Sequence, residues 1–239
     1  GQKNGLTASQ LSFVPMGVNA EVHQVTLRND SDAPKDVILT SFVEFCLWNA
    51  QDDMTNFQRN FSTGEVEVEG SIIYHKTEYR ERRNHYAFYA VNTPVDGFDT
   101  DMETFLGLYN GFENPQAVFT GKMGNSIASG WQPMAAHQVK VSLAPGEERR
   151  FNFVLGYVEV PQAEKFVAPS VINKAPAKAL LEKLTTDEQI ADAFNALKKH
   201  WDNLLSAYVL TTPDEKLGRM VNIWNPYQCM VTFNMSRST

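Results

Sequence analysis

Polar side chains that could contact a ligand gather in two segments of the sequence. The first is the stretch 49–63, which has little periodicity, and the second is the charged run 76–83, which His85 follows closely. Amides, carboxylates and guanidinium groups in loops between strands can hydrogen-bond a sugar, a carboxylate or a neighbouring subunit. The alternative is that both segments are solvated connections with weak surface ion pairs. The candidates for substrate or subunit contact are Asn49, Gln51, Asp52, Arg59, Asn60, Arg80, Arg82, Arg83 and His85, together with Trp131 in the loop-like sequence SGWQP.

Motifs that would carry catalysis or bind a metal are absent from the sequence. None of the five histidines has metal-ligand spacing, and there is no HExxH, CxxC, GxSxG or glycine-rich phosphate loop. Asp52 and Asp53 are adjacent, so their side chains diverge and do not form the facing carboxyl pair of a glycosidase. Glu44 interrupts an apolar strand, and we expect a buried carboxylate paired with an arginine. The sequence therefore predicts no catalytic residue and no metal site in this chain.

Composition excludes some partners. The net charge of −7 disfavours nucleic acid, whose phosphates need a basic surface. No apolar run approaches the ~20 residues of a membrane span, and the first residues lack the apolar core of a signal peptide. The two cysteines, Cys46 and Cys229, lie in apolar surroundings far apart in sequence, which predicts buried free thiols rather than a disulfide. These features together predict a cytoplasmic protein with no membrane contact.

The first two-thirds of the chain has the alternation of β-strands. Residues 138–143 and 151–160 flank the turn sequence APGEER and are predicted to form a hairpin. Many strands at short spacing, punctuated by Gly, Pro and Asn, predict an antiparallel β-sandwich over residues 1–165. The predicted strands cover residues 21–28, 37–48 (the longest apolar run, expected to be buried on both faces for part of its length), 64–69, 71–76, 86–91, 138–143 and 151–160.

Residues 166–239 have helical patterns instead. A helix is expected over 175–184, and a second begins at a capping box formed by Thr185 and Glu188. Thr212 and Glu215 repeat this signature before a third helix, which Pro226 is expected to kink or break. The second helix carries one apolar stripe, formed by Ile190, Phe194, Leu197, Trp201, Leu204, Leu205 and Tyr208.

Several long blocks resemble a known enzyme family. Four segments look like cellobiose phosphorylases, within the inverting disaccharide phosphorylase family: FVEFCLWNAQDD (42–53), IYHKTEYRERRNHYAF (73–88), INKAP (172–176), and VNIWN (221–225) with YQCMVTFNMSRS (227–238). Pro226 departs from the pattern of the relatives, which have glutamine at this position. The resemblance runs in the same order through nearly the whole chain. It implies a β-sandwich of the supersandwich type, a helical linker, an (α/α)6 catalytic barrel and a small C-terminal β piece.

The resemblance also implies an activity, and it implies which part of the enzyme carries the catalytic groups. Such enzymes reversibly phosphorolyse cellobiose to α-glucose 1-phosphate and glucose with inversion, using inorganic phosphate as co-substrate and no metal or organic cofactor. The chain is expected to lack the first sandwich strands and the catalytic barrel with its acid, to be inactive alone, and to serve as scaffold and homodimer contact. The alternative is a stand-alone carbohydrate-binding sandwich, with Trp48, Trp131 and Tyr109 as the aromatic platform.

Overall fold

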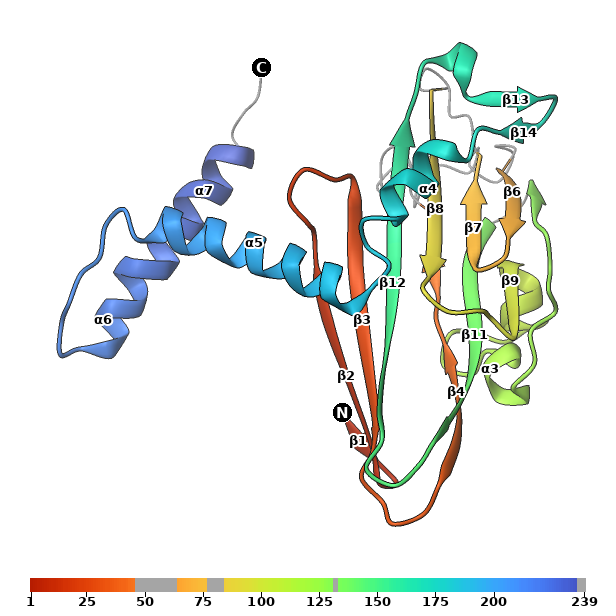
Figure 1. Ribbon diagram of the computed structural model, residues 1–239, viewed down its shortest axis with the longest axis horizontal. Helices are drawn as coiled ribbons and strands as arrows, with labels where there is room; N and C mark the ends of the chain where they lie inside the picture. The colour runs from red at the N-terminus through yellow and green to blue at the C-terminus, as the bar shows by residue number, and fades with distance from the viewer. Residues whose placement is uncertain (46–63, 77–83, 131–132, 236–239) are drawn as a thin grey trace. The chain divides into compact units, whose positions relative to one another are not determined.

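The long strands of this chain form two facing antiparallel sheets (Figure 1). The structure is a computed structural model that describes residues 1–45, 64–76, 84–130 and 133–235. Among these, eight strands form one sheet in the order β1-β2-β3-β12-β8-β7-β6-β10, and β4, β11, β5 and β9 form a shorter sheet. The strands of the long sheet are β1 (Gln2–Lys3), β2 (Leu6–Phe13), β3 (Ala20–Asn29), β6 (Gly64–Glu69), β7 (Ile72–His75), β8 (His85–Val91), β10 (Ser129–Gly130) and β12 (Glu148–Glu159). Those of the shorter sheet are β4 (Lys35–Thr40), β5 (Val43–Glu44), β9 (Gly97–Asp101) and β11 (Pro133–Leu143).

The core lies between the two sheets because alternate residues of each strand face inward. The long sheet contributes Tyr89, Phe151 and Phe153 to this core, and the shorter sheet contributes Val141 and Leu143. The predicted fold class, a mainly β antiparallel sandwich followed by helices, is confirmed.

The predicted hairpin between 138–143 and 151–160 is wrong. β11 pairs with β4, β5 and β9, whereas β12 pairs with β3 and β8, so the turn at Ala144–Glu147 carries the chain from one sheet to the other. The amide of Gly146 bonds the carbonyl of Asn29 at 2.8 Å instead of completing a ladder between its own flanking strands. A local turn signal cannot distinguish a hairpin from a crossover between sheets, because both need the chain to reverse direction.

The predicted long strand 37–48 is also shorter and more exposed than expected. It is divided into β4 and β5, and Ile38 in β4 is about half exposed. Residues 46–48, with Cys46 and Trp48, lie outside the described residues.

The outer face of the long sheet is covered by the segment that follows β12. This segment contains η2 (Gln162–Glu164), the hairpin of β13 (Phe166–Ala168) and β14 (Val171–Ile172), and α4 (Ala175–Leu181). Tyr86 donates its hydroxyl to the carbonyl of Asn173 at 2.7 Å, and its ring packs edge-on against Tyr74. Ala177 of α4 is fully buried. Residues 162–181 are therefore part of the sandwich unit.

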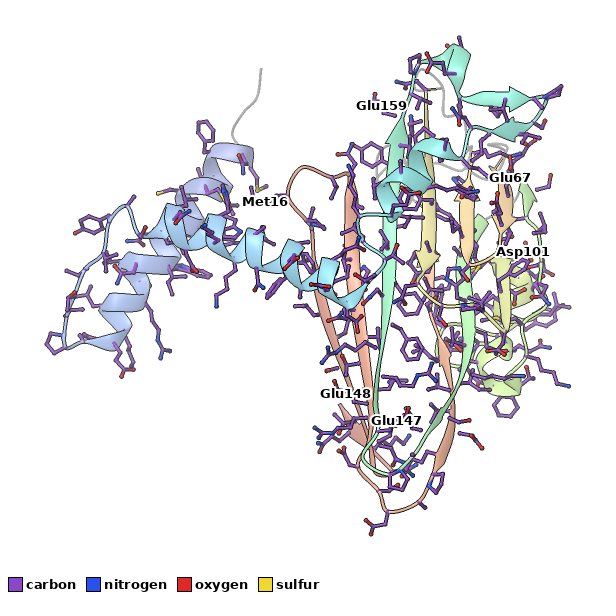
Figure 2. The ribbon with its side chains drawn as sticks, in the orientation of Figure 1. Met16, Glu67, Asp101, Glu147, Glu148 and Glu159 are labelled. Carbon is purple, nitrogen blue, oxygen red and sulfur yellow. The ribbon has the colours of Figure 1, made fainter. Side chains whose placement is uncertain are left out.

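An ion-pair ladder joins this segment to β6. Val66 and Val68 of β6 pack into or against the core, so the alternate residues Glu65, Glu67 and Glu69 face outward. Glu67 lies 2.8 Å from Lys174 and 3.3 Å from Lys76, while Glu69 pairs with Lys174 and Lys178. Figure 2 labels Glu67 on this strand. Strict alternation in GEVEVE thus predicts the strand, but only the tertiary structure supplies the lysines.

The chain divides into two compact units, Gly1–Ile190 and Ala191–Thr239. α5 (Asp187–Leu205) begins in the first unit, where Ile190 is buried. The predicted capping box has a shifted register: Thr186 Oγ1 accepts from the amide of Gln189 at 3.2 Å, and Gln189 Oε1 accepts from the amide of Thr186 at 3.0 Å. Thr186 and Gln189 therefore replace the predicted pair Thr185 and Glu188.

The second unit contains α6 (Glu215–Arg219), the π-helical segment η3 (Met220–Trp224) and α7 (Asn225–Met235). Asp214, rather than the predicted Thr212, caps α6 by accepting from the amides of Lys216 and Leu217. The π-helical turn ends at Trp224, two residues before Pro226, and α7 continues through the proline, so the helix accommodates the missing amide by widening instead of breaking.

Several residues of the second unit that were expected to be buried are exposed. Leu204 and Tyr208 of the predicted stripe are exposed, as are Trp224 and Tyr227. Cys229 is a free and exposed thiol, which contradicts the predicted burial. A periodic apolar stripe shows that a helix needs a partner surface, but it does not show that the surface belongs to the same unit.

Candidate functional site

Most of the predicted contact residues cannot be placed. Asn49, Gln51, Asp52, Arg59, Asn60, Arg80, Arg82, Arg83 and Trp131 lie outside the described residues. His85 is described: it is the first residue of β8, and it is 5% exposed. The environment of His85 therefore defines the part of the predicted site that the structure shows.

His85 lines a pocket of about 630 Å³ at one end of the sandwich. Pockets of this size commonly hold small ligands. Figure 2 shows Met16, in the β2–β3 connection, and Glu159, at the end of β12, at the same end of the sandwich and opposite Glu147 and Glu148. The pocket is lined by Val14, Val18, Asn19, Ala20, Glu21, Glu44, Phe45, His85, Ala87, Leu155, Gly156, Tyr157 and Glu159.

Strand alternation explains why polar groups appear here. Phe153 of β12 lies in the core and Leu155 packs against it, and the same face continues with Tyr157 and Glu159 as the strand runs toward its end. Glu21 of β3 stands opposite Leu155 in the ladder. Polar residues therefore replace apolar ones at core-facing positions near the strand ends, which leaves an open mouth between the sheets.

The carboxylates of the pocket are held by neighbouring polar groups. Glu159 Oε1 accepts from Asn84 Nδ2 at 3.1 Å, and the Asn84 carbonyl accepts from the amide of Val160 at 2.8 Å. Glu21 Oε1 lies 3.1 Å from His23 Nε2. His23 Nδ1 is in turn 2.9 Å from Ser12 Oγ and 3.0 Å from Gln10 Nε2. This chain of contacts fixes the side chains at the mouth.

Glu44 does not behave as predicted. It is exposed, and within the described part of the chain it has no hydrogen-bond or ion-pair partner. The prediction of a buried, arginine-paired carboxylate is wrong because Glu44 is the last residue of the short strand β5, where the apolar face of the strand ends.

The sequence reasoning missed Tyr157, Glu159 and Glu21. A signal was present: in FNFVLGYVE the residues at alternate positions are Phe151, Phe153, Leu155, Tyr157 and Glu159, so the core-facing series changes from apolar to polar. That change indicates where the core ends, and a polar residue beyond it faces an opening rather than packed side chains.

A second pocket of about 580 Å³ lies where β12, the β6–β7 and β8–β9 turns and the end of α4 meet. Its amide groups are engaged by the protein itself. Asn92 Nδ2 donates to the Thr185 carbonyl at 3.2 Å and Asn92 Oδ1 accepts from the Asn152 amide at 2.9 Å. Asn152 Nδ2 also donates to Asp187 Oδ1 at 2.9 Å. These bonds give the second pocket a structural role in joining α4 and α5 to the sheet.

The described histidines do not form a metal site, and no group of three His, Cys, Asp or Glu among the described residues could hold a metal ion. His137 lies inside the core, stacked on Tyr89 with 5.0 Å between ring centroids. Burial lowers the pKa of His137 to about 3, so the ring is neutral. Burial likewise raises the pKa of Tyr89 to about 12.

The predicted aromatic platform has one described member. Tyr109 is fully exposed and has a left-handed backbone with φ of 65°, whereas Trp48 and Trp131 lie outside the described residues. No helix in the described part of the chain is long and apolar enough to cross a membrane.

Comparison with known proteins identifies the family. Residues 1–187 match the sequence family "Glycosyl hydrolase 94, supersandwich domain", and residues 200–239 match "Glycosyl hydrolase 94 superfamily, catalytic domain". The two matches follow the order that the resemblance implied.

Curated relatives agree with this assignment. N,N'-diacetylchitobiose phosphorylase of Vibrio proteolyticus is 31% identical over 98% of this chain and 28% of its own length. Solabiose phosphorylase of Paenibacillus borealis is 26% identical over 100% of this chain and 29% of its own length. The chain thus spans less than a third of either relative.

A solved structure is similar in fold. A chain described as a candidate kojibiose phosphorylase from the human microbiome has a TM-score of 0.50 at 9% identity, and the match covers 82% of this chain and 21% of that one. At this low identity, the similarity is evidence for the fold alone. The match over residues 1–187 is what identifies the family: this chain belongs to the glycosyl hydrolase 94 supersandwich domain family.

Proposed function

We propose that this chain is the N-terminal portion of an inverting disaccharide phosphorylase that acts on cellobiose. The observation that carries the proposal is the order of the two family matches, with a supersandwich over residues 1–187 followed by the start of a catalytic domain at 200–239. The sequence blocks that look like cellobiose phosphorylases support the choice of substrate. The 31% identity to an N,N'-diacetylchitobiose phosphorylase makes that disaccharide the main competitor.

In the proposed reaction, inorganic phosphate attacks the anomeric carbon of the non-reducing glucose. An acidic side chain protonates the glycosidic oxygen, glucose leaves, and α-glucose 1-phosphate forms with inversion. Phosphate occupies the place that activated water takes in an inverting hydrolase, so one catalytic carboxyl suffices. The reaction needs no metal or organic cofactor. We assign the acid and the phosphate-binding groups to the remainder of the enzyme and not to this chain.

Within that enzyme we propose that residues 1–190 act as scaffold and contribute to a homodimer in the cytoplasm. The pocket at the end of the sandwich supports this role. Phe45 and His85 line the pocket, and they flank in sequence the segments that carry the predicted contact residues.

The test uses the full-length gene product and this chain in parallel. Each is incubated with phosphate and either cellobiose or N,N'-diacetylchitobiose, and the sugar 1-phosphate is identified by mass spectrometry. We expect the full-length protein to form glucose 1-phosphate from cellobiose and this chain to form none. Phosphorolysis of N,N'-diacetylchitobiose but not of cellobiose would overturn the substrate assignment. If neither disaccharide were phosphorolysed, the result would argue against a phosphorylase of these substrates.

A further inference from the structure

Three side chains on β2 and β3 have the relative positions of a nucleophile, a base and an acid. Ser12 and His23 are directly opposite each other in the ladder of these two neighbouring strands (Figure 1), so their side chains lie on the same face of the sheet. Glu21 is two residues before His23 on β3 and therefore shares that face. A serine hydroxyl held by a histidine, which a carboxylate orients, is an arrangement that enzymes use for nucleophilic catalysis.

The contacts among the three side chains have hydrogen-bond distances. Ser12 Oγ is 2.9 Å from His23 Nδ1, and His23 Nε2 is 3.1 Å from Glu21 Oε1. Because an ionised carboxylate only accepts hydrogen bonds, the ring nitrogen that faces it carries the proton, and in the neutral ring Nδ1 keeps its lone pair. The neutral imidazole is therefore in the tautomer that can accept the hydroxyl proton of Ser12.

Gln10, two residues before Ser12 on β2, fixes the direction of the hydroxyl group. Gln10 Nε2 donates to Ser12 Oγ at 2.9 Å and lies 3.0 Å from His23 Nδ1. Since the oxygen of Ser12 accepts from Gln10, the proton of Ser12 is left to be donated to His23. The amide of Gln10 also supplies a hydrogen-bond donor beside the attacking oxygen, where an acyl substrate develops negative charge during the attack.

A small molecule can reach this group of side chains. Ser12 and Gln10 are exposed, and the side chains of His23 and Glu21 are 22% and 44% exposed. Glu21 also lines the pocket of about 630 Å³, as does Val14, two residues after Ser12. The accessible face of β2 and β3 is therefore continuous with a space large enough for a small ligand.

Burial does not explain why these bonds form. Buried polar groups must find partners within the protein, whereas exposed groups can bond to water instead. Ser12 and Gln10 are exposed, so the network is not needed to satisfy them. An ordered serine, histidine and glutamate on an accessible face is therefore better explained by chemistry than by stability.

We propose that Ser12, His23 and Glu21 form a nucleophilic site that hydrolyses small carboxylic esters. Ser12 Oγ attacks the carbonyl carbon, and His23 Nδ1 accepts the hydroxyl proton. The ester C–O bond then breaks, the alcohol leaves with that proton, and the acyl group remains on Ser12. Water attacks the acyl carbon and gives a proton to His23, and the carboxylic acid leaves as Ser12 regains its proton.

In this site Glu21 is a positioning residue, because it acts by holding the imidazole through Nε2. The activity is separate from the proposed phosphorolysis, whose acid is assigned to the remainder of the enzyme. Loss of either activity therefore leaves the other unaffected.

The test measures hydrolysis of p-nitrophenyl acetate by the 239-residue chain carrying Cys229→Ser, because the exposed thiol of Cys229 would attack the same ester. We expect saturable turnover with a burst of p-nitrophenol, which is the sign of an acyl intermediate. Ser12→Ala and His23→Ala should each lower kcat/KM by about a hundredfold. Absence of turnover, or turnover unchanged by Ser12→Ala, would refute the proposal.

Two further measurements separate chemistry from structure. Added imidazole replaces the missing base and should restore turnover to His23→Ala but not to Ser12→Ala; no restoration in His23→Ala would contradict the assigned base. Glu21→Gln should lower kcat about tenfold at an unchanged KM, because a charge-assisted hydrogen bond that orients His23 corresponds to about one decade. A change in KM alone would contradict the positioning role.

Ser142→Ala is the matched control, because the hydroxyl of Ser142 donates to a carboxylate, Asp36 Oδ1, at 2.6 Å instead of to a histidine. This variant should retain full turnover, and an equal loss would contradict the assignment. Far-UV circular dichroism checks that each variant is folded. Reaction of the chain with a fluorophosphonate, followed by peptide mass spectrometry, needs no substitution at the site and should place the adduct on Ser12. An adduct on Ser142, or none, would refute the proposal.

Discussion

Glu67 on β6 provides the sharpest test of how the segment 162–181 is anchored to the sheet. Its carboxylate contacts Lys174 at 2.8 Å and Lys76 at 3.3 Å, and it accepts from the amide of Ile172 at 2.9 Å. The side chain of Glu67 is only 16% exposed and that of Lys76 is 7% exposed, so these pairs are largely shielded from solvent. We expect Glu67→Gln to lower the free energy of unfolding.

The size of the change in the free energy of unfolding depends on the contacts that remain in the Glu67→Gln variant. Breaking a fully buried pair costs ~3–5 kcal/mol, because it leaves a charge without compensation. Here Lys76 retains Glu65 at 3.0 Å and the Ser170 carbonyl, and the glutamine oxygen can still accept from Ile172. The loss is therefore nearer the ~1.5–3 kcal/mol of one charge-assisted hydrogen bond, and we expect about 2 kcal/mol.

The assay is urea unfolding followed by far-UV circular dichroism, with linear extrapolation to water. Glu148→Gln is the control, because its pair with Arg150 is solvent-exposed and should contribute at most about 0.5 kcal/mol. A double-mutant cycle with Lys174→Met isolates the pair itself. If Glu67→Gln destabilised the protein no more than Glu148→Gln, the ladder would not anchor this segment.

The same ladder predicts a pH dependence. Burial alone would raise the pKa of Glu67, but hydrogen bonds from Lys174, the Ile172 amide and Lys76 outweigh it and lower the pKa below the ordinary 4.5. The hydrogen bond with Glu67 raises the pKa of Lys174 above 10.5. The carboxylate contribution is present above pH 4.5 and is lost as the pH falls through the lowered value. The lysine contribution is present below pH 10.5 and is lost as the pH rises through the raised value. The contribution of the ladder to the free energy of unfolding should therefore be constant between pH 4.5 and pH 10.5. Glu67→Gln should reduce the loss of stability that occurs at acid pH.

Three further predictions concern other parts of the chain. A Cβ at Gly156 would lie 2.5 Å from Phe88 Cζ, so Gly156→Ala should lower the free energy of unfolding by ~1–3 kcal/mol. At Gly218, within α6, the added Cβ would lie 3.6 Å from Thr212, so Gly218→Ala should raise the free energy of unfolding by ~0.5–1 kcal/mol. Urea unfolding measures both variants, and equal effects would contradict the packing argument. The pKa of His137 is about 3 in the folded protein and 6.5 in the unfolded chain, so the unfolded chain binds the proton first and stability should fall as the pH drops between these values. His137→Phe should remove this pH dependence, and an unchanged dependence would assign it to other groups. The exposed apolar residues Ile223, Trp224, Tyr227 and Phe233 should bind a hydrophobic dye strongly, and a monodisperse, dye-silent chain would be evidence against an open surface in the second unit.

The sequence by itself determined the class of the fold and most of its elements. Alternation with a period of two marks β3 and β6, because a strand between core and solvent must alternate. The apolar runs of β8 and of the middle of β12 mark strands that are buried on both faces. Capping residues placed the starts of α5 and α6 to within one or two residues, since helix amides need acceptors at the first turn. The family resemblance also came from the sequence, in blocks that the comparisons support at the level of the family.

Only the tertiary structure decided which strands pair and where polar groups converge. The chain at Ala144–Glu147 crosses between sheets although its turn chemistry is that of a hairpin, because pairing depends on strands distant in sequence. Likewise Glu21, Glu44 and Glu159 line one pocket although they are 23 or more positions apart, since the ends of β3, β5 and β12 meet at one end of the sandwich. Local sequence fixes the backbone conformation and the face on which a side chain lies. The neighbours on that face are set by the packing of the two sheets.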